Sequence, residues 1–319
     1  MNVRRLISGT AVAAATALGL GALSACSSDS SAADGGSGGK LDVVASFYPM
    51  QYLAEQIGGG HVSVSTLTEP GQEPHDLEIS AKQTVDLQKA DAVLYLKGLQ
   101  PAVDKAVAQS EAKTKIDAAT LTTLEKHGVT GDSHEGEDAH SDENASGLDP
   151  HVWLDPVKYA EIADGVSAAF QKADPAHAAE YKKNAGALTA KLNSLNTSFE
   201  DGLKNTATKV FFTNHAAFGY LAERYGLTQE AITGVDPESE PSAARMKQLQ
   251  QEAKADGVTT VFYETLVSDK TAKTLAEDAN LRTDVLDPLE GITKKSRGTD
   301  YLAVMEANLK ALRTALGAK

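Results

Sequence analysis

The chain has 319 residues, enough for two domains of ordinary size, and its formal net charge is -14. An acidic chain of this kind is a poor nucleic-acid binder and suits small cations better than anions. It contains a single cysteine, so its stability must come from core packing rather than from an internal disulfide.

Residues 1–25 have the pattern of a secretory signal peptide. Arg4 and Arg5 precede an apolar run that ends in small residues. The next residue, Cys26, completes the sequence LSAC, which resembles a lipobox, where the cysteine carries a lipid and becomes the new N-terminus. A simple signal peptide followed by a chance cysteine is the alternative. No other stretch approaches the roughly 20 apolar residues of a membrane span, so we expect an extracytoplasmic or periplasmic chain that is lipid-anchored to the outer face of the cell membrane.

Residues 26–40 consist mainly of Ser, Ala, Asp and Gly and are expected to form a flexible linker. Strand and helix patterns then alternate, which predicts a first α/β lobe over residues 41–173. Ser80 is expected to cap the second helix of this lobe. The expected strands are 41–47, 61–67 and 92–96, and the expected helices are 49–57 and 80–89.

Residues 121–147 differ from the rest of the lobe, because they are rich in acids and histidines and have little apolar surface to bury. We expect most of this segment to be disordered. His127, His134 and His140 give it the composition of a weak, exposed metal-binding loop, and a solvated acidic loop is the alternative.

The segment Leu148–Pro156 reads LDPHVWLDP and contains two Asp-Pro steps. A residue before proline is pushed out of the helical region, so we expect an extended, stiff loop. Such a loop can hold the imidazole of His151 in one place, as a metal ligand requires. The alternative is a turn with an incidental histidine and a packed Trp153.

A helix is expected over residues 158–172, and a longer one over residues 174–205, with Asp174 as its cap and Pro175 at its first position. At 1.5 Å per residue, a helix of about 30 residues spans roughly 45 Å, long enough to join two lobes. Its apolar residues recur at helical spacing and form one stripe, made of Tyr181, Leu188, Leu192, Leu195, Phe199 and Leu203.

The strand and helix alternation resumes after this helix and predicts a second α/β lobe over residues 206–319. The expected strands are 209–213, 259–263 and 283–286, and the expected helices are 217–225, 242–255, 269–279 and 301–316.

Three candidate ligands follow strands, where open α/β sheets bind their ligands. They are His75, His215 and Asp287, and His151 in its stiff loop is the fourth. Three imidazoles and one carboxylate suit zinc, whereas Mn²⁺ prefers more oxygen ligands.

Each candidate has an ordinary alternative. A lone histidine after a strand is more often a hydrogen-bonded polar residue than a ligand, and we leave His61 and His177 in that class. Asp287 precedes a proline and suits a turn, and Glu264, which also follows a strand, is the runner-up for its place. Glu73 is a candidate to orient an imidazole.

The chain resembles the zinc and manganese solute-binding lipoproteins of bacterial ABC importers. The resemblance covers about Leu41 to Leu316, and its motifs are specific in combination and in order. The matching pieces are EPHDLEIS with KADAVLYLKG, DPHVWLDP, TNHAAFGYLAERYGL, PESEPSAARM, VFYETLVSDKTAKTLAEDANL, LDPLEG and DYLAVMEANLKAL.

The resemblance implies two α/β lobes joined by a single long rigid helix, with the metal in the cleft between them. The metal ligands of the family fall on His75, His151, His215 and Asp287. His215 stands where manganese members usually carry a glutamate, and an acidic, His-rich loop at residues 121–147 is typical of zinc members. The cysteine pair of some zinc members is missing, so this chain lacks that clamp on its second lobe.

We therefore expect a monomeric receptor that captures Zn²⁺ and delivers it to an ABC permease. A manganese receptor or an adhesin of the same fold is the alternative. A zinc hydrolase is less well supported, because the chain has no HExxH motif and a fourth protein ligand would close the position that a catalytic zinc keeps for water.

Overall fold

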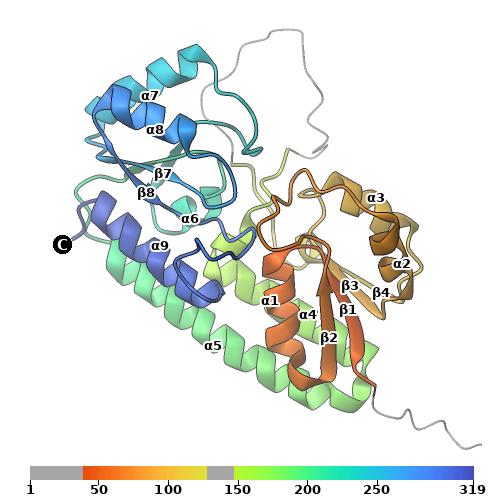
Figure 1. Cartoon of the computed structure of the whole chain (residues 1–319). Helices are drawn as coiled ribbons and strands as arrows, with labels where there is room; N and C mark the ends of the chain where they lie inside the picture. The colour runs from red at the N-terminus through yellow and green to blue at the C-terminus, as the bar shows by residue number, and fades with distance from the viewer. Residues whose placement is uncertain (1–38, 128–146) are drawn as a thin grey trace, which may run out of the picture. The chain divides into compact units, whose positions relative to one another are not determined.

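The computed structural model describes residues 39–127 and 147–319. Within them, the first lobe is a parallel sheet with the strand order β2-β1-β3-β4 (Figure 1). Its elements are β1 (Leu41–Ala45), α1 (Tyr48–Gly58), β2 (Val62–Thr66), α2 (Ala81–Lys89), β3 (Ala92–Tyr95), α3 (Pro101–Gln109) and β4 (Thr114–Asp117). Neither α3 nor β4 was predicted from the sequence, and β4, with the sequence TKID, carries polar residues at the edge of the sheet.

Both faces of this sheet are covered, as is usual for parallel sheets. Neighbouring residues of β1 point to opposite faces, so Val43 packs in the main core with α1, while Val44 packs with Leu87 of α2 and Val103 of α3. Helix α2 begins where expected, because the Ser80 side chain accepts from the backbone N–H of Gln83.

The second lobe repeats this arrangement with the strand order β6-β5-β7-β8. Strand β6 was not predicted, because its sequence, TQEA, is polar and only partly buried. The elements of the lobe are β5 (Val210–Thr213), α6 (Gly219–Arg224), β6 (Thr228–Ala231), α7 (Ala243–Ala255), β7 (Thr260–Tyr263), α8 (Lys270–Ala279), β8 (Arg282–Val285) and α9 (Tyr301–Ala315).

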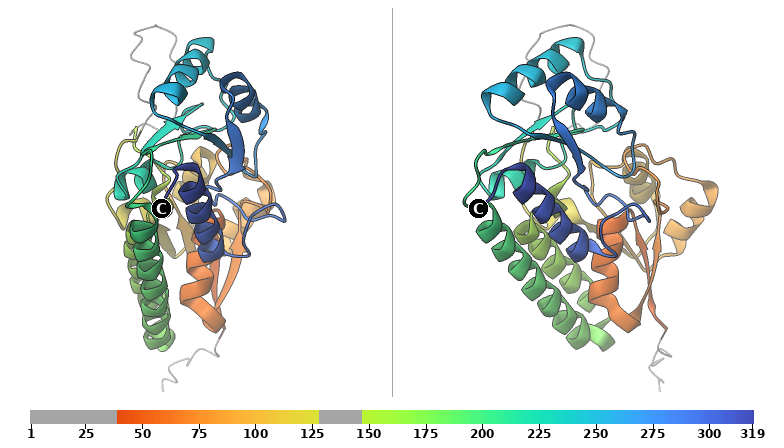
Figure 2. Two further views of the ribbon diagram at one scale, coloured as in Figure 1. Left: turned by 90° about the vertical axis from the view of Figure 1, so that its left-hand side faces the viewer. Right: turned by 60° about the vertical axis from the view of Figure 1, so that its left-hand side comes forward.

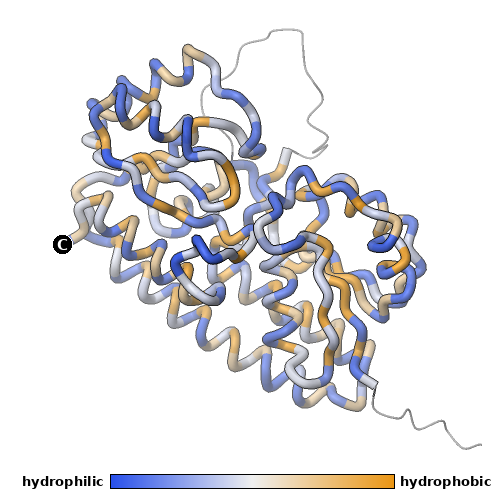
Figure 3. The backbone as a smooth tube through the Cα atoms, in the orientation of Figure 1, coloured by the Kyte–Doolittle hydropathy of each residue, from blue (hydrophilic) through white to orange (hydrophobic). Residues whose placement is uncertain are grey.

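Helix α5 (Ala178–Leu203) runs along both lobes, packing on α4 (Pro156–Ala173) and α1 at one end and on α9 at the other (Figures 1 and 2). At 1.5 Å per residue its 26 residues span roughly 39 Å. Every residue of the expected apolar stripe is buried, and polar and apolar residues alternate along the helix in Figure 3.

The start of α5 differs from the expectation. Residues Pro175–His177 form a short 3₁₀ turn, and the α-helix begins at Ala178. Asp174 does not cap the helix by a side-chain bond. Its carboxylate instead accepts from the Tyr181 hydroxyl at 2.7 Å and faces the His177 Nδ1 at 2.7 Å.

The segment Leu148–Pro156 is held firmly, but it is not extended as expected. Val152–Leu154 form a 3₁₀ turn, and Asp155 caps α4 by accepting from the Val157 N–H at 2.9 Å. Trp153 is fully buried, and its indole N–H donates to the Pro288 carbonyl at 2.7 Å. This bond ties the His151 segment to the loop that follows β8. Among the described residues, no helix is both long and apolar enough to cross a membrane.

Candidate metal centre

Three histidines from distant parts of the sequence meet between the two lobes. His75 lies in the loop after β2, His151 precedes the 3₁₀ turn, and His215 follows β5. Their Nε2 atoms lie 3.5, 3.2 and 3.4 Å, respectively, from the Oε1 atom of Glu290, which follows β8. One ligand atom from each of the four residues lies within 4.8 Å of the others, so they could hold one metal ion.

The group is buried, and the atoms that face its centre lack hydrogen-bond partners among the described residues. The side chains of His151, His215 and Glu290 are at most 1% exposed, and that of His75 is 11% exposed. Among the described residues, none forms a hydrogen bond of good geometry with the three Nε2 atoms or with either Glu290 oxygen. Leaving a buried polar group unsatisfied costs about 1–3 kcal/mol, so five such atoms in one place fit a site that binds a cation.

Two of the imidazoles are oriented by carboxylates at their far nitrogens. The Nδ1 of His151 lies 2.8 Å from Asp149 Oδ1, and the Nδ1 of His215 lies 2.7 Å from Glu264 Oε1. A carboxylate that accepts from Nδ1–H leaves the Nε2 lone pair free to bind metal. Burial lowers the pKa of His215, but the charges of Glu264 and Glu290 outweigh it and hold the pKa well above its usual range.

Three of the four residues selected from the sequence as metal ligands belong to this group, and its carboxylate is that of Glu290 rather than Asp287. Asp287 is outside the group, because its Oδ1 accepts from the Leu289 N–H at 2.9 Å and its Oδ2 from the Thr265 hydroxyl at 3.3 Å. Burial raises the pKa of Asp287 to about 6. Asp287 shapes the turn that presents Glu290.

Glu290 was missed because the sequence shows only that LDPLEG offers two acids three residues apart. Which of them faces the histidines depends on the turn. Leu289 adopts a positive φ of 62°, a conformation that non-glycine residues rarely take, and the Asp287 backbone is fixed by Asn308. This unusual turn directs Glu290, and not Asp287, toward the imidazoles.

The other sequence candidates have different positions. Glu264 supports His215 and is not in the four-residue group. Glu73 accepts from the Asp76 N–H at 3.2 Å, and burial raises its pKa to about 7, but no hydrogen bond to the His75 ring is among the contacts of the described residues. His61 and His177 stack on each other with ring centroids 3.9 Å apart, away from the group.

Of the expected loop histidines, His127 is described, whereas His134 and His140 lie outside the described residues, as does Cys26. His127 lies between two carboxylates, with Nδ1 3.1 Å from Asp149 Oδ2 and Nε2 2.9 Å from Glu223 Oε2. Glu125, His127 and Glu223 form a second group that could hold a metal ion.

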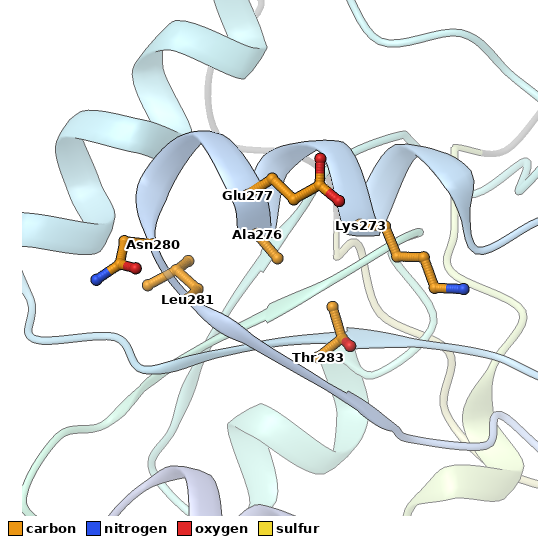
Figure 4. A pocket seen from close by; sticks show the side chains of 6 residues that line it. All are labelled: Lys273, Ala276, Glu277, Asn280, Leu281 and Thr283. Carbon is orange, nitrogen blue, oxygen red and sulfur yellow. The ribbon is translucent and has the colours of Figure 1, made fainter.

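A surface pocket between α8 and β8 shares no residue with either group (Figure 4). It contains no histidine or cysteine, so it offers neither an imidazole nor a thiolate ligand, and Glu277 is its only carboxylate. The lining residues are Lys273, Ala276, Glu277, Asn280, Leu281 and Thr283.

Two parallel-sheet α/β lobes joined by a long helix, with a histidine-rich group between them, define the class of metal-binding solute-binding proteins. The family model described as "Zinc-uptake complex component A periplasmic" (ZnuA) matches residues 43–315, and the chain belongs to this family. The resemblance found in the sequence and the expected fold class are confirmed.

Individual relatives agree with this membership. The chain is 38% identical over 282 residues to the zinc-binding lipoprotein AdcA of Streptococcus pneumoniae (strain ATCC BAA-255 / R6), covering 86% of this chain and 56% of that protein. The chain therefore spans little more than half the length of the AdcA proteins that it matches. It is 35% identical over 285 residues to the high-affinity zinc uptake system protein ZnuA of Bacillus subtilis (strain 168), covering 88% of each.

Solved structures show the same fold. The Zn(II)-bound ZnuA-like domain of S. pneumoniae AdcA has a TM-score of 0.72 and 35% identity, covering 87% of this chain and 99% of that one. The laminin-binding protein Lmb of Streptococcus agalactiae has a TM-score of 0.76 and 30% identity, covering 87% of this chain and 100% of that one.

Proposed function

We propose that this protein captures Zn²⁺ outside the cytoplasm and delivers it to the permease of an ABC importer. The observation that carries the proposal is the convergence of three imidazole Nε2 atoms and one carboxylate in a buried, unsatisfied group. Membership of the zinc-uptake family supports it, as do the names of two relatives, a zinc-binding lipoprotein and a high-affinity zinc uptake protein.

The proposed zinc ligands are His75, His151, His215 and Glu290. Three nitrogens and one oxygen match the ligand set and four-coordinate geometry that zinc prefers, with bonds of about 2.0–2.2 Å. The Glu290 charge offsets part of the charge of the ion, and the Asp149 and Glu264 carboxylates behind two of the imidazoles add to this effect. The same donor set disfavours Mn²⁺, the metal of the alternative receptor.

A transport role suits this site better than hydrolysis. Two relatives are named as a zinc-binding lipoprotein and a high-affinity zinc uptake system protein. A catalytic zinc keeps one position open for water, whereas four protein side chains here each offer a ligand atom. The proposed location is extracytoplasmic with a lipid on Cys26, in line with the lipoprotein name of AdcA.

The test is metal analysis of the purified protein followed by competition between Zn²⁺ and Mn²⁺. We expect one tightly bound zinc per chain. Glu290→Gln should weaken zinc binding on the order of 10–100-fold or more, whereas Asp287→Asn, the matched change three residues earlier, should have a smaller effect. Equal affinities for the two metals, or a larger loss in Asp287→Asn than in Glu290→Gln, would contradict the function or the ligand set, respectively.

A further inference from the structure

The His127 side chain lies between the two lobes and is held there by contacts on both sides of its ring. Its two ring nitrogens face carboxylates of different lobes, Asp149 of the first and Glu223 on α6 of the second. Its ring meets the Tyr220 ring edge-on, with centroids 4.4 Å apart and an interplanar angle of 74°. The side chain is only 18% exposed, so His127 is not a free loop histidine.

The neighbouring residues are shaped to accept this ring. A Cβ atom added at Gly219 would lie 2.3 Å from the His127 Cβ, far inside van der Waals contact, so only glycine leaves room there. The Tyr220 hydroxyl donates to the Asp149 carbonyl at 2.8 Å and accepts from the Glu125 N–H at 2.8 Å. The Asp149 N–H donates to the Glu125 carbonyl, also at 2.8 Å. His127 and Asp149 are thus held in fixed relation to each other.

Asp149 connects His127 to the metal centre. Its Oδ1 accepts from both the backbone N–H and the Nδ1 of His151, at 2.9 and 2.8 Å. Its Oδ2 faces His127, the one hydrogen-bond partner of that oxygen among the described residues. The Asp149 side chain is fully buried, so removing His127 would leave a buried carboxylate oxygen without this partner.

We propose that His127 is a positioning residue for the zinc site, which acts on the ligand His151 through the shared carboxylate of Asp149. The inference rests on the proposed function and extends it. With its donor on Oδ2, Asp149 stays in the plane and orientation that fix the His151 ring. Without the donor, the carboxylate is free to rotate, and the Nε2 of His151 is held less well. Mutating a residue that orients a metal ligand typically weakens metal binding on the order of 10–100-fold.

We do not assign a separate metal site to the second acid–histidine group, which consists of Glu125, His127 and Glu223. Glu125 Oε1 already binds the Lys158 ammonium at 2.8 Å, and both nitrogens of His127 face carboxylates. The group therefore has a resident cation and none of the unpaired nitrogens that mark the main centre.

The experiment compares His127→Ala, His127→Asn and Lys126→Ala in the full chain. The zinc dissociation constant is measured by chelator competition, and the visible absorption of the Co²⁺-loaded protein reports the ligand geometry. We expect His127→Ala to weaken zinc binding on the order of tenfold and to change the cobalt spectrum. His127→Asn can place its amide donor near the position of Nδ1, so it should restore most of the affinity and the spectrum. Lys126→Ala removes a neighbouring exposed positive charge and should leave both unchanged.

Each other result overturns the inference in a defined way. Unchanged affinity in His127→Ala, or equal losses in the Ala and Asn variants, would show that the bond to Asp149 does not position His151. Loss of a second, weaker zinc equivalent with an intact tight site would make His127 a ligand instead. If His127→Ala does not fold, Gly219→Ala displaces the same ring, and unchanged zinc affinity in that variant contradicts the inference. The unmodified chain and His151→Ala are measured alongside. If the unmodified chain does not bind zinc tightly, the proposed function itself is contradicted.

Discussion

At the scale of single residues, the choice of metal depends on the donor atom that each ligand supplies. The third imidazole, His215, is completely buried and its Nδ1 is held by Glu264. Because it supplies nitrogen where an oxygen would favour manganese, Zn²⁺ should outcompete Mn²⁺ by orders of magnitude. His215→Glu should narrow that gap, which competition titrations with both metals will measure. A gap as wide in His215→Glu as in the unmodified chain would show that this residue does not set the preference.

Acidity acts on the same imidazoles. Zinc binds neutral imidazole, and a free histidine titrates near pH 6.5. In the metal-free protein, carboxylate partners outweigh burial and raise the pKa of His151 and His215, so these rings hold protons to higher pH. Protons therefore compete more strongly than at a free histidine, and zinc affinity should already fall as the pH drops from about 8 through 7 and should continue to fall below that. Chelator competition between about pH 8 and 5 tests this, and a flat profile would exclude three histidine ligands.

At the scale of elements, α5 determines how firmly the two lobes are joined. Leu192, in the middle of its buried stripe, is fully buried, whereas the adjacent Lys191 is exposed. Leu192→Ala should lower the free energy of unfolding by about 2–5 kcal/mol, and Lys191→Ala should change it little. Urea unfolding of the metal-free variants measures both effects. Similar effects in the two variants would mean that packing along α5 contributes little to stability.

The rigidity of α5 also bears on how metal is released. A single continuous helix that packs on both lobes limits hinge bending, so we expect capture and release to involve local shifts of loops such as those carrying His75 and Glu290. His75 is the one partly exposed member of the metal group. We therefore expect the metal ion to enter and leave the group beside the loop that carries His75.

At the scale of the whole molecule, the cleft group and the acidic, His-rich segment should bind zinc with different strengths. The cleft ligands are held by strand ends and a 3₁₀ turn, so little ordering remains to be done on binding. For a segment of this acidic, apolar-poor composition we expect metal binding to carry an ordering cost, which would weaken any site there. The residues Thr130–Ser146 lie outside the described ones. Deleting them keeps His127 in the chain, and the variant should retain one tight zinc and lose the weaker sites.

Calorimetry on the deletion variant and on His151→Ala distinguishes the two kinds of site. The point variant should lose the tight zinc and keep the weaker ones. If the deletion variant instead loses the tight zinc, the segment and not the cleft would be the primary site.

The sequence by itself predicted two α/β lobes, a long joining helix and three of the four residues that the structure brings together in one group. Hydrophobic periodicity marks buried strands and long helices, and imidazoles placed after strands must meet at the carboxyl edges of parallel sheets. Short polar edge strands such as β4 and β6 were not predicted, because their stability comes from pairing with neighbouring strands rather than from their own residues.

Only the tertiary structure decided which carboxylate joins the histidines and what His127 does. Asp287 and Glu290 are chemically similar. The left-handed backbone at Leu289, together with the two hydrogen bonds between Asn308 and the Asp287 backbone, directs Glu290 inward. His127 belongs by composition to an acidic loop, but the space over Gly219 and the shared Asp149 carboxylate place it behind His151. Both outcomes depend on contacts between residues far apart in the chain, which no local pattern records.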